Sequence, residues 1–263
     1  MTDSESGSAP SRPRRGWLRA LWSDRVDPNT YLGLHLTVAL AVALSAIWLF
    51  STLLDAILDN DALVRWDMAA DLAIHQRMTA PSLRIVDMVT QLGSPIAMVL
   101  VCLIVAGVLW RRGVRSVLWG WLAAFVGGAA VGQILKLVVH RTRPVYGAAY
   151  LHGNSFSFPS GHAMGSVIGY GMCVYLVRHV WHARPVRRRL ATLLAVLLIL
   201  AIGTSRILLG VHYPSDVVGG WAAGLAWMTI CISGIGIAQQ RRLDRTHPAS
   251  ADVLVDAQRH PAS

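Results

Sequence analysis

The chain has 263 residues, of which 54% are hydrophobic and only 14% are charged. An average soluble domain carries about 25% charged residues, so this composition excludes an ordinary soluble protein and predicts one membrane-embedded domain. The formal net charge of +10 does not indicate nucleic-acid binding, because the basic residues form short clusters between apolar runs, as cytoplasmic loops of membrane proteins do.

Six apolar runs are long enough to cross a bilayer, whose hydrocarbon core takes roughly 20 helical residues. They cover about 33–56, 93–110, 115–138, 160–181, 189–208 and 215–238. The sequence therefore predicts an all-α fold, a bundle of six transmembrane helices. The first run is too long for the apolar part of a signal peptide, roughly 7–15 residues, so we expect it to be an uncleaved span.

The spans define a membrane domain, residues 31–240, between two tails. Residues 1–30 and 241–263 are rich in Ser, Pro, Ala, Asp and Arg, and are predicted to be disordered. The cysteines all lie inside apolar runs, which predicts packing residues and no disulfide framework. They are Cys102, Cys173 and Cys231.

The distribution of basic residues predicts the orientation of the bundle. Seventeen of the 24 Lys and Arg residues fall in the two tails or in the loops around residues 111–115 and 178–189. Because Lys and Arg concentrate in cytoplasmic loops, we expect both termini in the cytoplasm and the protein in the plasma membrane, with the loops after spans one, three and five outside.

The first outside segment, residues 58–92, mixes aspartates with Leu, Ile and Trp. This pattern predicts one or two short amphipathic helices on the outer surface of the membrane. We expect a packed lid without chemistry there, in preference to a guide for lipid.

Small residues recur four apart in three of the spans, and this spacing lets helix backbones approach closely. They are Gly128 and Gly132, Gly161, Gly165 and Gly169, and Gly220 and Gly224. Spans three, four and six are therefore predicted to form the tight centre of the bundle.

Ionisable residues are costly in a membrane and usually functional there, and the predicted topology brings several to the outer face. Lys136 ends the third span, Arg143 follows in the next loop, and Arg206 ends the fifth span. These three cations oppose the positive-inside trend, so an anion is needed to explain them. Phosphate fits, because Arg grips it with a planar fork and Lys adds a point charge.

The segment 159–162, Pro-Ser-Gly-His, opens the fourth span. Ser160 can cap the helix and Gly161 allows close approach, so that free N–H groups and the positive end of the dipole face an anion. An ordinary cap explains Ser160 alone. With His162 and three cations nearby, an anion site is the better interpretation.

His212 and Asp216 lie four residues apart at the start of the sixth span. If the helix begins near Pro214, Asp216 can reach back to one imidazole nitrogen of His212. That hydrogen bond would fix the tautomer, stabilise positive charge on the ring and leave the other nitrogen free to attack phosphorus.

Three segments together resemble the type-2 phosphatidic acid phosphatase superfamily, also called the lipid phosphate phosphatase and vanadium haloperoxidase superfamily. Residues 136–144 match K-x6-R-P, residues 159–162 match P-S-G-H, and residues 205–216 match S-R-x5-H-x3-D, without departure at any defining position. The order of the motifs and their places at span ends agree as well. The resemblance covers residues 120–236 well.

The resemblance implies a role for each motif residue. His212 would attack phosphorus and form a phosphohistidine, Asp216 would orient it, and His162 would be the general acid and then the base that activates water. The phosphate oxygens would be held by Lys136, Arg143, Arg206 and the backbone of Ser160 and Gly161. No metal and no other cofactor is implied, since the outer face lacks the carboxylate cluster that Mg²⁺ usually needs. His140 and Arg141 are not motif positions, and a solvated loop is expected for them in preference to contacts with phosphate or headgroup.

The expected function is hydrolysis of a membrane lipid phosphate monoester or diphosphate at the outer face. An undecaprenyl-type diphosphate is the leading substrate, and phosphatidic acid and phosphatidylglycerol phosphate are alternatives because the motifs read only the phosphate. A lipid phosphotransferase is a second hypothesis. A non-catalytic channel or transporter is a third, disfavoured because the polar groups gather at one end of the spans. The six spans exclude a soluble haloperoxidase. The expected partners are the lipid substrate and the bilayer, without nucleic acid, and no oligomeric state is predicted.

Overall fold

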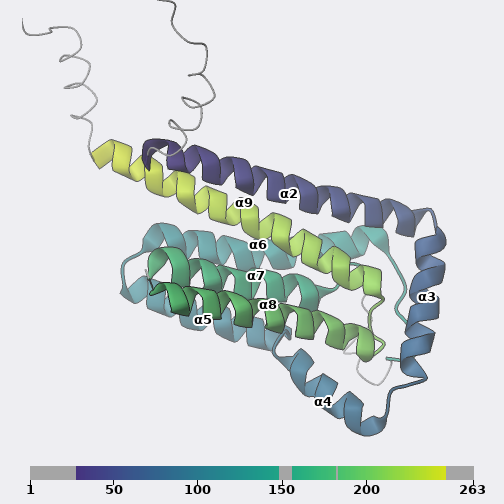
Figure 1. The fold of residues 1–263 in the computed structure, drawn as a ribbon. Coiled ribbons are helices and arrows are strands. Elements are labelled where there is room, and N and C mark those ends of the chain that lie inside the picture. Colours follow the sequence, from purple (N-terminus) through teal and green to yellow (C-terminus); the bar gives the residue numbers. More distant parts are fainter. Residues whose placement is uncertain (1–27, 148–155, 182, 247–263) are drawn as a thin grey trace, which may run out of the picture. The chain divides into compact units, whose positions relative to one another are not determined.

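A computed structural model describes residues 28–147, 156–181 and 183–246 of the chain (Figure 1). The chain divides into two compact units, residues 1–38 and 39–263. Of the first unit, only the start of helix α2 (Pro28–Leu58) lies within the described residues. The predicted tails fall mostly outside them. Everything below concerns the second unit.

All regular structure in the described residues is helical, which confirms the predicted all-α class. After α2 come α3 (Ala62–His75), α4 (Ala80–Gln91), α5 (Pro95–Arg111), α6 (Arg115–Val139), α7 (Gly161–Tyr175), the π-helical turn η2 (Leu176–Val180), α8 (Pro185–Leu208) and α9 (Pro214–Thr246).

Helices within the described ranges form five candidate membrane spans by length and composition. They cover 36–58, 80–111, 115–139, 185–208 and 214–241, close to five of the six predicted runs. The predicted fourth span corresponds to α7 and η2 and is not among the five. Helix α7 alone has 15 residues, whereas a crossing takes roughly 20.

Two turns carry the chain from helix ends into the loops that bear the motifs. His140 caps the C-terminal end of α6 in a left-handed backbone conformation with φ of 51°. Residues 141–143 follow directly in the loop. After α8, Gly210 has φ of 64°, a conformation that glycine adopts without steric cost. This turn leads directly to His212 and to Pro214, the first residue of α9.

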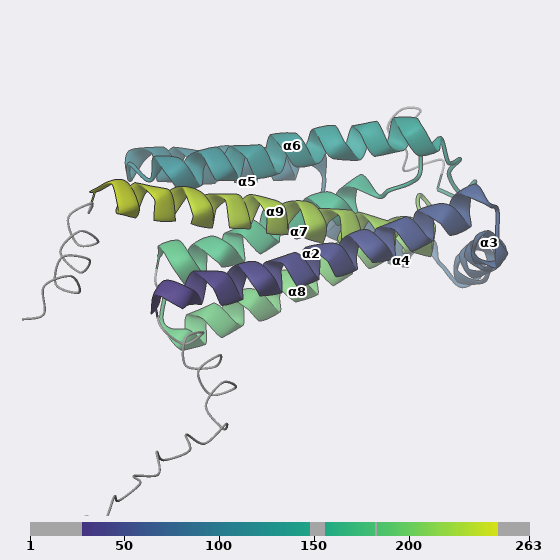
Figure 2. The ribbon, with the colours of Figure 1, turned by 90° about the horizontal axis from the view of Figure 1, so that it is seen from above.

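Helix α7 packs against α6, α8 and α9 at the centre of the second unit (Figures 1 and 2). A Cβ atom on Gly220 would lie 2.6 Å from the carbonyl oxygen of Ser160, and one on Gly224 would lie 2.8 Å from that of Met164. Only glycine permits this approach of α9 to α7. The prediction that spans three, four and six lie together is confirmed, and the close approach sets the first turns of α7 and α9 side by side.

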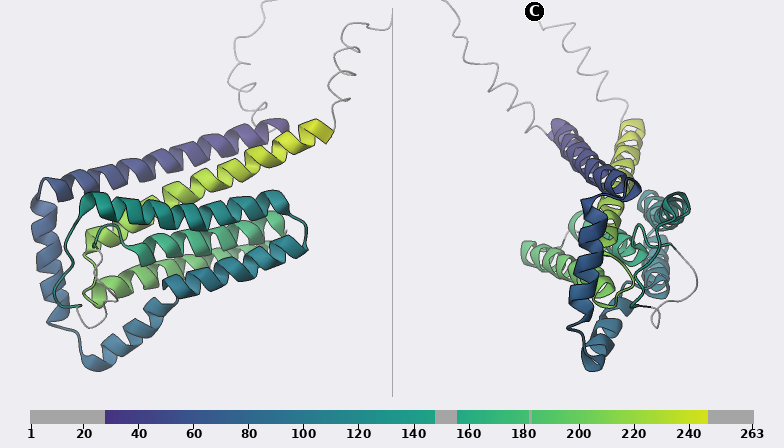
Figure 3. Two further views of the ribbon diagram at one scale, coloured as in Figure 1. Left: turned by 180° about the vertical axis from the view of Figure 1, so that it is seen from behind. Right: turned by 90° about the vertical axis from the view of Figure 1, so that its right-hand side faces the viewer.

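Helices α3 and α4 lie at one end of α5–α9, on the right in Figure 1 and on the left in the rear view of Figure 3. Two short helices do lie within residues 58–92, and their predicted place on the outer surface of the membrane stays a prediction. The three cysteines are free, as predicted.

Candidate active site

The predicted site residues gather at the end of the helices where α3 and α4 lie. Lys136 is in the last turn of α6 and Arg206 in the last turn of α8, whereas His162 and Asp216 are in the first turns of α7 and α9. Lys136 and His162 both lie close enough to Arg143 and Arg206 to interact electrostatically with them. Helix ends from four different parts of the chain therefore meet at one site.

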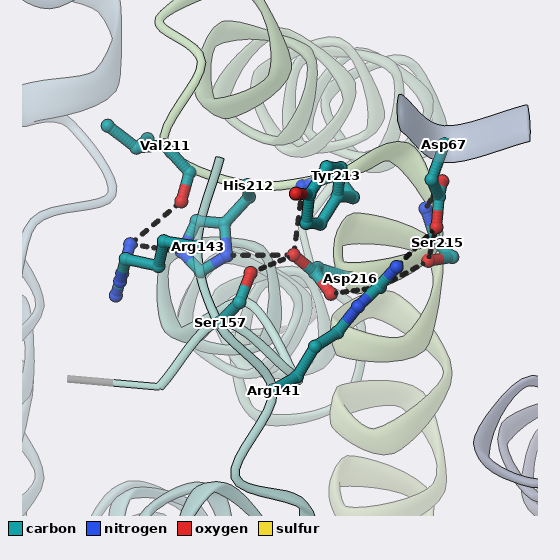
Figure 4. Close-up of polar contacts among 9 residues, drawn as sticks. All are labelled: Asp67, Arg141, Arg143, Ser157, Val211, His212, Tyr213, Ser215 and Asp216. Carbon is teal, nitrogen blue, oxygen red and sulfur yellow. Dashed lines mark hydrogen bonds and ion pairs between the residues drawn. The ribbon is translucent and has the colours of Figure 1, made fainter. Parts of the chain in front are cut away.

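The ring of His212 is buried and has a different partner at each nitrogen (Figure 4). Nε2 lies 3.3 Å from Nη1 of Arg143, and Nδ1 lies 3.4 Å from Oδ2 of Asp216. A guanidinium only donates hydrogen bonds, so Nε2 is the acceptor with the free electron pair and Nδ1 carries the proton. Nε2 therefore points toward the cation Arg143.

The protonation of His212 follows from its burial. Burial lowers the pKa of His212 to about 4, outweighing the attraction of Asp216, which raises it. The pKa falls because desolvation disfavours the charged form of an imidazole. At neutral pH the ring is therefore uncharged, and its electron pair is available.

The carboxylate of Asp216 is fully buried and held by several donors. Oδ2 accepts from the hydroxyl of Ser157 and, at 2.8 Å, from the N–H of Tyr213. Oδ1 accepts from Nη1 of Arg141 at 2.6 Å. These bonds fix the carboxylate 3.4 Å from Nδ1 of His212, as an ion-pair contact in place of the predicted hydrogen bond.

The cations around the site are fixed by neighbours from other segments. Nη1 of Arg143 donates to the carbonyl oxygen of Val211 at 2.9 Å. Nη1 of Arg206 donates to Oγ1 of Thr90 at 3.0 Å, and within the described part of the chain its Nε has no hydrogen-bond partner. Thr90 lies in α4 and is buried. No motif pointed to it.

The first turn of α7 corrects two expectations about Ser160. The residue stands at the N-cap, but its hydroxyl makes no capping hydrogen bond. Its N–H is taken by the carbonyl oxygen of Asp216 at 2.9 Å, so this group does not bind a phosphate. Its Oγ is buried and has no hydrogen-bond partner among the residues described. Buried hydroxyls normally have one, and an anion bound at the first N–H groups of α7 would supply it.

The expectation that Arg141 is solvated is wrong, because its side chain is buried. It bridges Asp216 and Asp67, with Nη2 donating to Oδ2 of Asp67 at 2.8 Å, and its guanidinium stacks on the ring of Tyr213 at 4.5 Å. Two buried carboxylates hold it in place. His140, by contrast, is exposed, as expected.

Asp67 is a site neighbour that the motifs do not reveal. Val64, Asp67 and Asp71 are buried on one face of α3. The helical spacing of these two aspartates and the valine is the sequence pattern that could have indicated a buried face. Thr90 contacts Arg206, a predicted site residue, and Asp67 contacts Arg141. Segment 58–92 therefore packs against the site, and the absence of chemistry there stays a prediction.

Comparisons with known proteins agree with this geometry. A sequence profile of the PAP2 superfamily matches residues 117–238. Phosphatidylglycerophosphatase B of Bacillus subtilis (strain 168) is 34% identical over 141 residues, covering 52% of this chain and 67% of the relative. Decaprenylphosphoryl-5-phosphoribose phosphatase of Mycobacterium tuberculosis is 33% identical over 131 residues, covering 48% and 66%.

A solved structure has the same arrangement of helices. It is the crystal structure of the first transmembrane PAP2 type phosphatidylglycerolphosphate phosphatase from Bacillus subtilis, which is 26% identical. It superposes with a TM-score of 0.64 over 75% of this chain and 96% of that one.

Proposed function

Since the chain belongs to the PAP2 superfamily and its relatives are phosphoric ester hydrolases, we propose that it hydrolyses a lipid phosphate through a phosphohistidine on His212. The observation that carries the proposal is the placement of the uncharged ring, with the electron pair of Nε2 directed at Arg143. Arg206 and Lys136 lie around the same point.

In the first step, Nε2 of His212 attacks phosphorus and the bond to the lipid oxygen breaks. His162 gives its proton to that oxygen. The phosphate oxygens are held by Lys136, Arg143 and Arg206, with the Ser160 hydroxyl and the Gly161 N–H as further donors. The phosphorylated ring becomes positive with its proton on Nδ1, and Asp216 stabilises that charge.

In the second step, His162 takes a proton from water, and the water oxygen attacks the phosphohistidine. The P–N bond breaks, inorganic phosphate leaves and His212 is regenerated uncharged. If an alcohol such as glycerol or inositol attacks instead, the product is a phosphate ester and the enzyme is a phosphotransferase. Product analysis in the presence of glycerol separates the two reactions.

The relatives support two substrate classes. The relative and the solved structure from Bacillus subtilis act, by their names, on a phosphatidylglycerol phosphate, and the mycobacterial relative acts on a decaprenyl phosphoryl sugar phosphate. We therefore propose a terminal lipid phosphate as the substrate, with phosphatidylglycerol phosphate tested first and an undecaprenyl-type diphosphate second.

The purified protein is expected to release phosphate from at least one lipid of a panel containing phosphatidylglycerol phosphate, phosphatidic acid and undecaprenyl diphosphate. Release is expected to persist in excess EDTA, because cationic side chains balance the phosphate charge. Vanadate is expected to inhibit, since it resembles five-coordinate phosphorus. Colorimetric phosphate release measures all three results. A wild-type protein that releases no phosphate from any lipid, or that needs added Mg²⁺, contradicts the proposal.

We also propose that α7 with η2 completes a six-span domain, with cytoplasmic termini and the site at the outer face. The basic loops near 111–115 and 184–189 lie at the other end of the helices from the site (Figure 1), which supports this orientation.

Two exposed valines provide a matched test of the orientation. Val145 is 78% exposed near the site and Val186 is 74% exposed at the opposite end. A membrane-impermeant thiol reagent on intact cells is expected to label Val145→Cys and to spare Val186→Cys until the cells are lysed. The reverse pattern would place the site in the cytoplasm.

A further inference from the structure

Asp67 of α3 is completely buried and belongs to the same hydrogen-bonded cluster as Asp216 (Figure 4). Its Oδ1 accepts from the N–H of Ser215 at 3.1 Å, and its Oδ2 accepts from the Ser215 hydroxyl and from Nη2 of Arg141. Asp67 lies outside residues 117–238, the part that matches the family profile. It therefore reaches the site from a segment that carries none of the motifs.

Arg141 divides its two outer nitrogens between two carboxylates. Nη1 binds Oδ1 of Asp216 at 2.6 Å and the hydroxyl of Ser215 at 2.7 Å, whereas Nη2 binds Asp67 at 2.8 Å. Because Arg141 occupies Oδ1 of Asp216, the other oxygen is left to face His212. The guanidinium thus orients the carboxylate that orients the nucleophile.

The charges of the cluster do not cancel. One guanidinium lies between two carboxylates, so the cluster formed by Asp67, Arg141 and Asp216 has a net charge of −1. Without Asp67, the positive charge of Arg141 would offset the negative charge of Asp216. In a buried environment such charges act strongly on a neighbouring ring.

The other charged groups that face His212 act in the opposite direction. Arg143 in the loop after α6 and Arg206 in α8 both disfavour a positive ring, and His162 in α7 does so when protonated. Asp216 in α9 is the carboxylate that contacts the ring. A phosphohistidine cation at this position therefore depends on the negative charge that remains on the cluster.

On the basis of the proposed function, we infer that Asp67 and Arg141 are positioning residues for Asp216. Arg141 fixes the carboxylate, and Asp67 prevents Arg141 from neutralising it. Together they set how readily His212 accepts positive charge during phosphoryl transfer.

Charge variants test this inference through the pH profile of kcat/KM on the lipid that the wild type hydrolyses. The acid limb of that profile marks protonation of His212. Asp67→Asn removes a negative charge, so it is expected to move the acid limb to lower pH and to lower kcat about tenfold. Arg141→Gln removes a positive charge and is expected to move the limb to higher pH. The double variant keeps the charge of −1 and is expected to return the limb to its wild-type position.

Asp61→Asn is the matched control, because Asp61 is exposed just before the same helix and makes no capping hydrogen bond. It is expected to retain the wild-type profile. If both single variants lose activity with an unmoved acid limb, or if Asp67→Asn behaves like Asp61→Asn, the inference is wrong. If Asp67→Asn does not fold alone, a folded double variant with the wild-type limb supports the inference, and an unfolded one overturns it. A wild type without lipid phosphatase activity refutes the proposed function itself.

Discussion

His212→Ala is expected to lower turnover at least about a thousandfold, because it removes the proposed nucleophile and leaves only binding and electrostatic stabilisation. The buried ring has one unprotonated nitrogen, Nε2, that can attack phosphorus, and alanine offers no such group. Quenching the wild type with ³²P-labelled substrate is expected to trap an acid-labile, base-stable phosphoenzyme. The same experiment on His212→Ala is expected to trap none.

His162→Ala is expected to fail in a different way, since it keeps the proposed nucleophile but loses the proposed proton donor. Its defect is expected to shrink on a nitrophenyl phosphate, whose leaving group needs no proton. His140→Ala serves as the control, because His140 is exposed at the end of α6. Label on His212→Ala and none on His162→Ala would reverse the two assignments.

The pH dependence of the wild type follows from the same two histidines. The pKa of His212 is lowered to about 4, mainly by burial, so the ring is reactive above that value and activity falls as the pH drops through it. A phosphate anion bound beside His162 favours its protonated form, so activity is also expected to fall at high pH, where that proton is lost. A bell-shaped profile is the expected result.

Gly220→Ala is expected to lower kcat/KM about a hundredfold, because an error of about 1 Å in a reacting geometry costs that much. The added Cβ would lie 2.6 Å from the carbonyl oxygen of Ser160 and 3.0 Å from the Cβ of Ala163. Helix α9 must then move away from the start of α7. This separates His212 and Asp216 from His162 and the Gly161 N–H, and overpacking of this kind also destabilises by about 1–3 kcal/mol.

Gly234→Ala provides the control in the same helix, since nothing lies within 4 Å of the Cβ it would add. It is expected to keep both the activity and the melting temperature of the wild type. Phosphate release and thermal unfolding followed by circular dichroism measure the two effects. A Gly220→Ala protein that is fully active would show that the two helix starts need not touch.

The sequence predicts much of this site because the motif residues lie at the ends of apolar runs, and topology alone then brings Lys136, Arg206 and His162 together. The glycine spacing likewise predicts the contact of α7 with α9. The partners of Arg141 and Arg206 could not be predicted in this way. Asp67 and Thr90 come from short helices whose packing is set by tertiary contacts and not by run length. Nor could sequence spacing reveal that the carbonyl oxygen of Asp216 accepts from the backbone N–H of Ser160.

Thr90 and Asp67 also determine which segment must be transferred when the site of this chain is moved into a relative. The profile of the superfamily covers residues 117–238, yet Arg206 is held by a hydroxyl at position 90 and Arg141 by a carboxylate at position 67. In a chimaera that joins the motif-bearing half of this chain to the first half of a relative, both arginines would depend on the residues that the relative has at these two positions. The smallest exchangeable cassette therefore begins before α3, and a swap that starts at α5 would replace the supports of two arginines while leaving every motif intact.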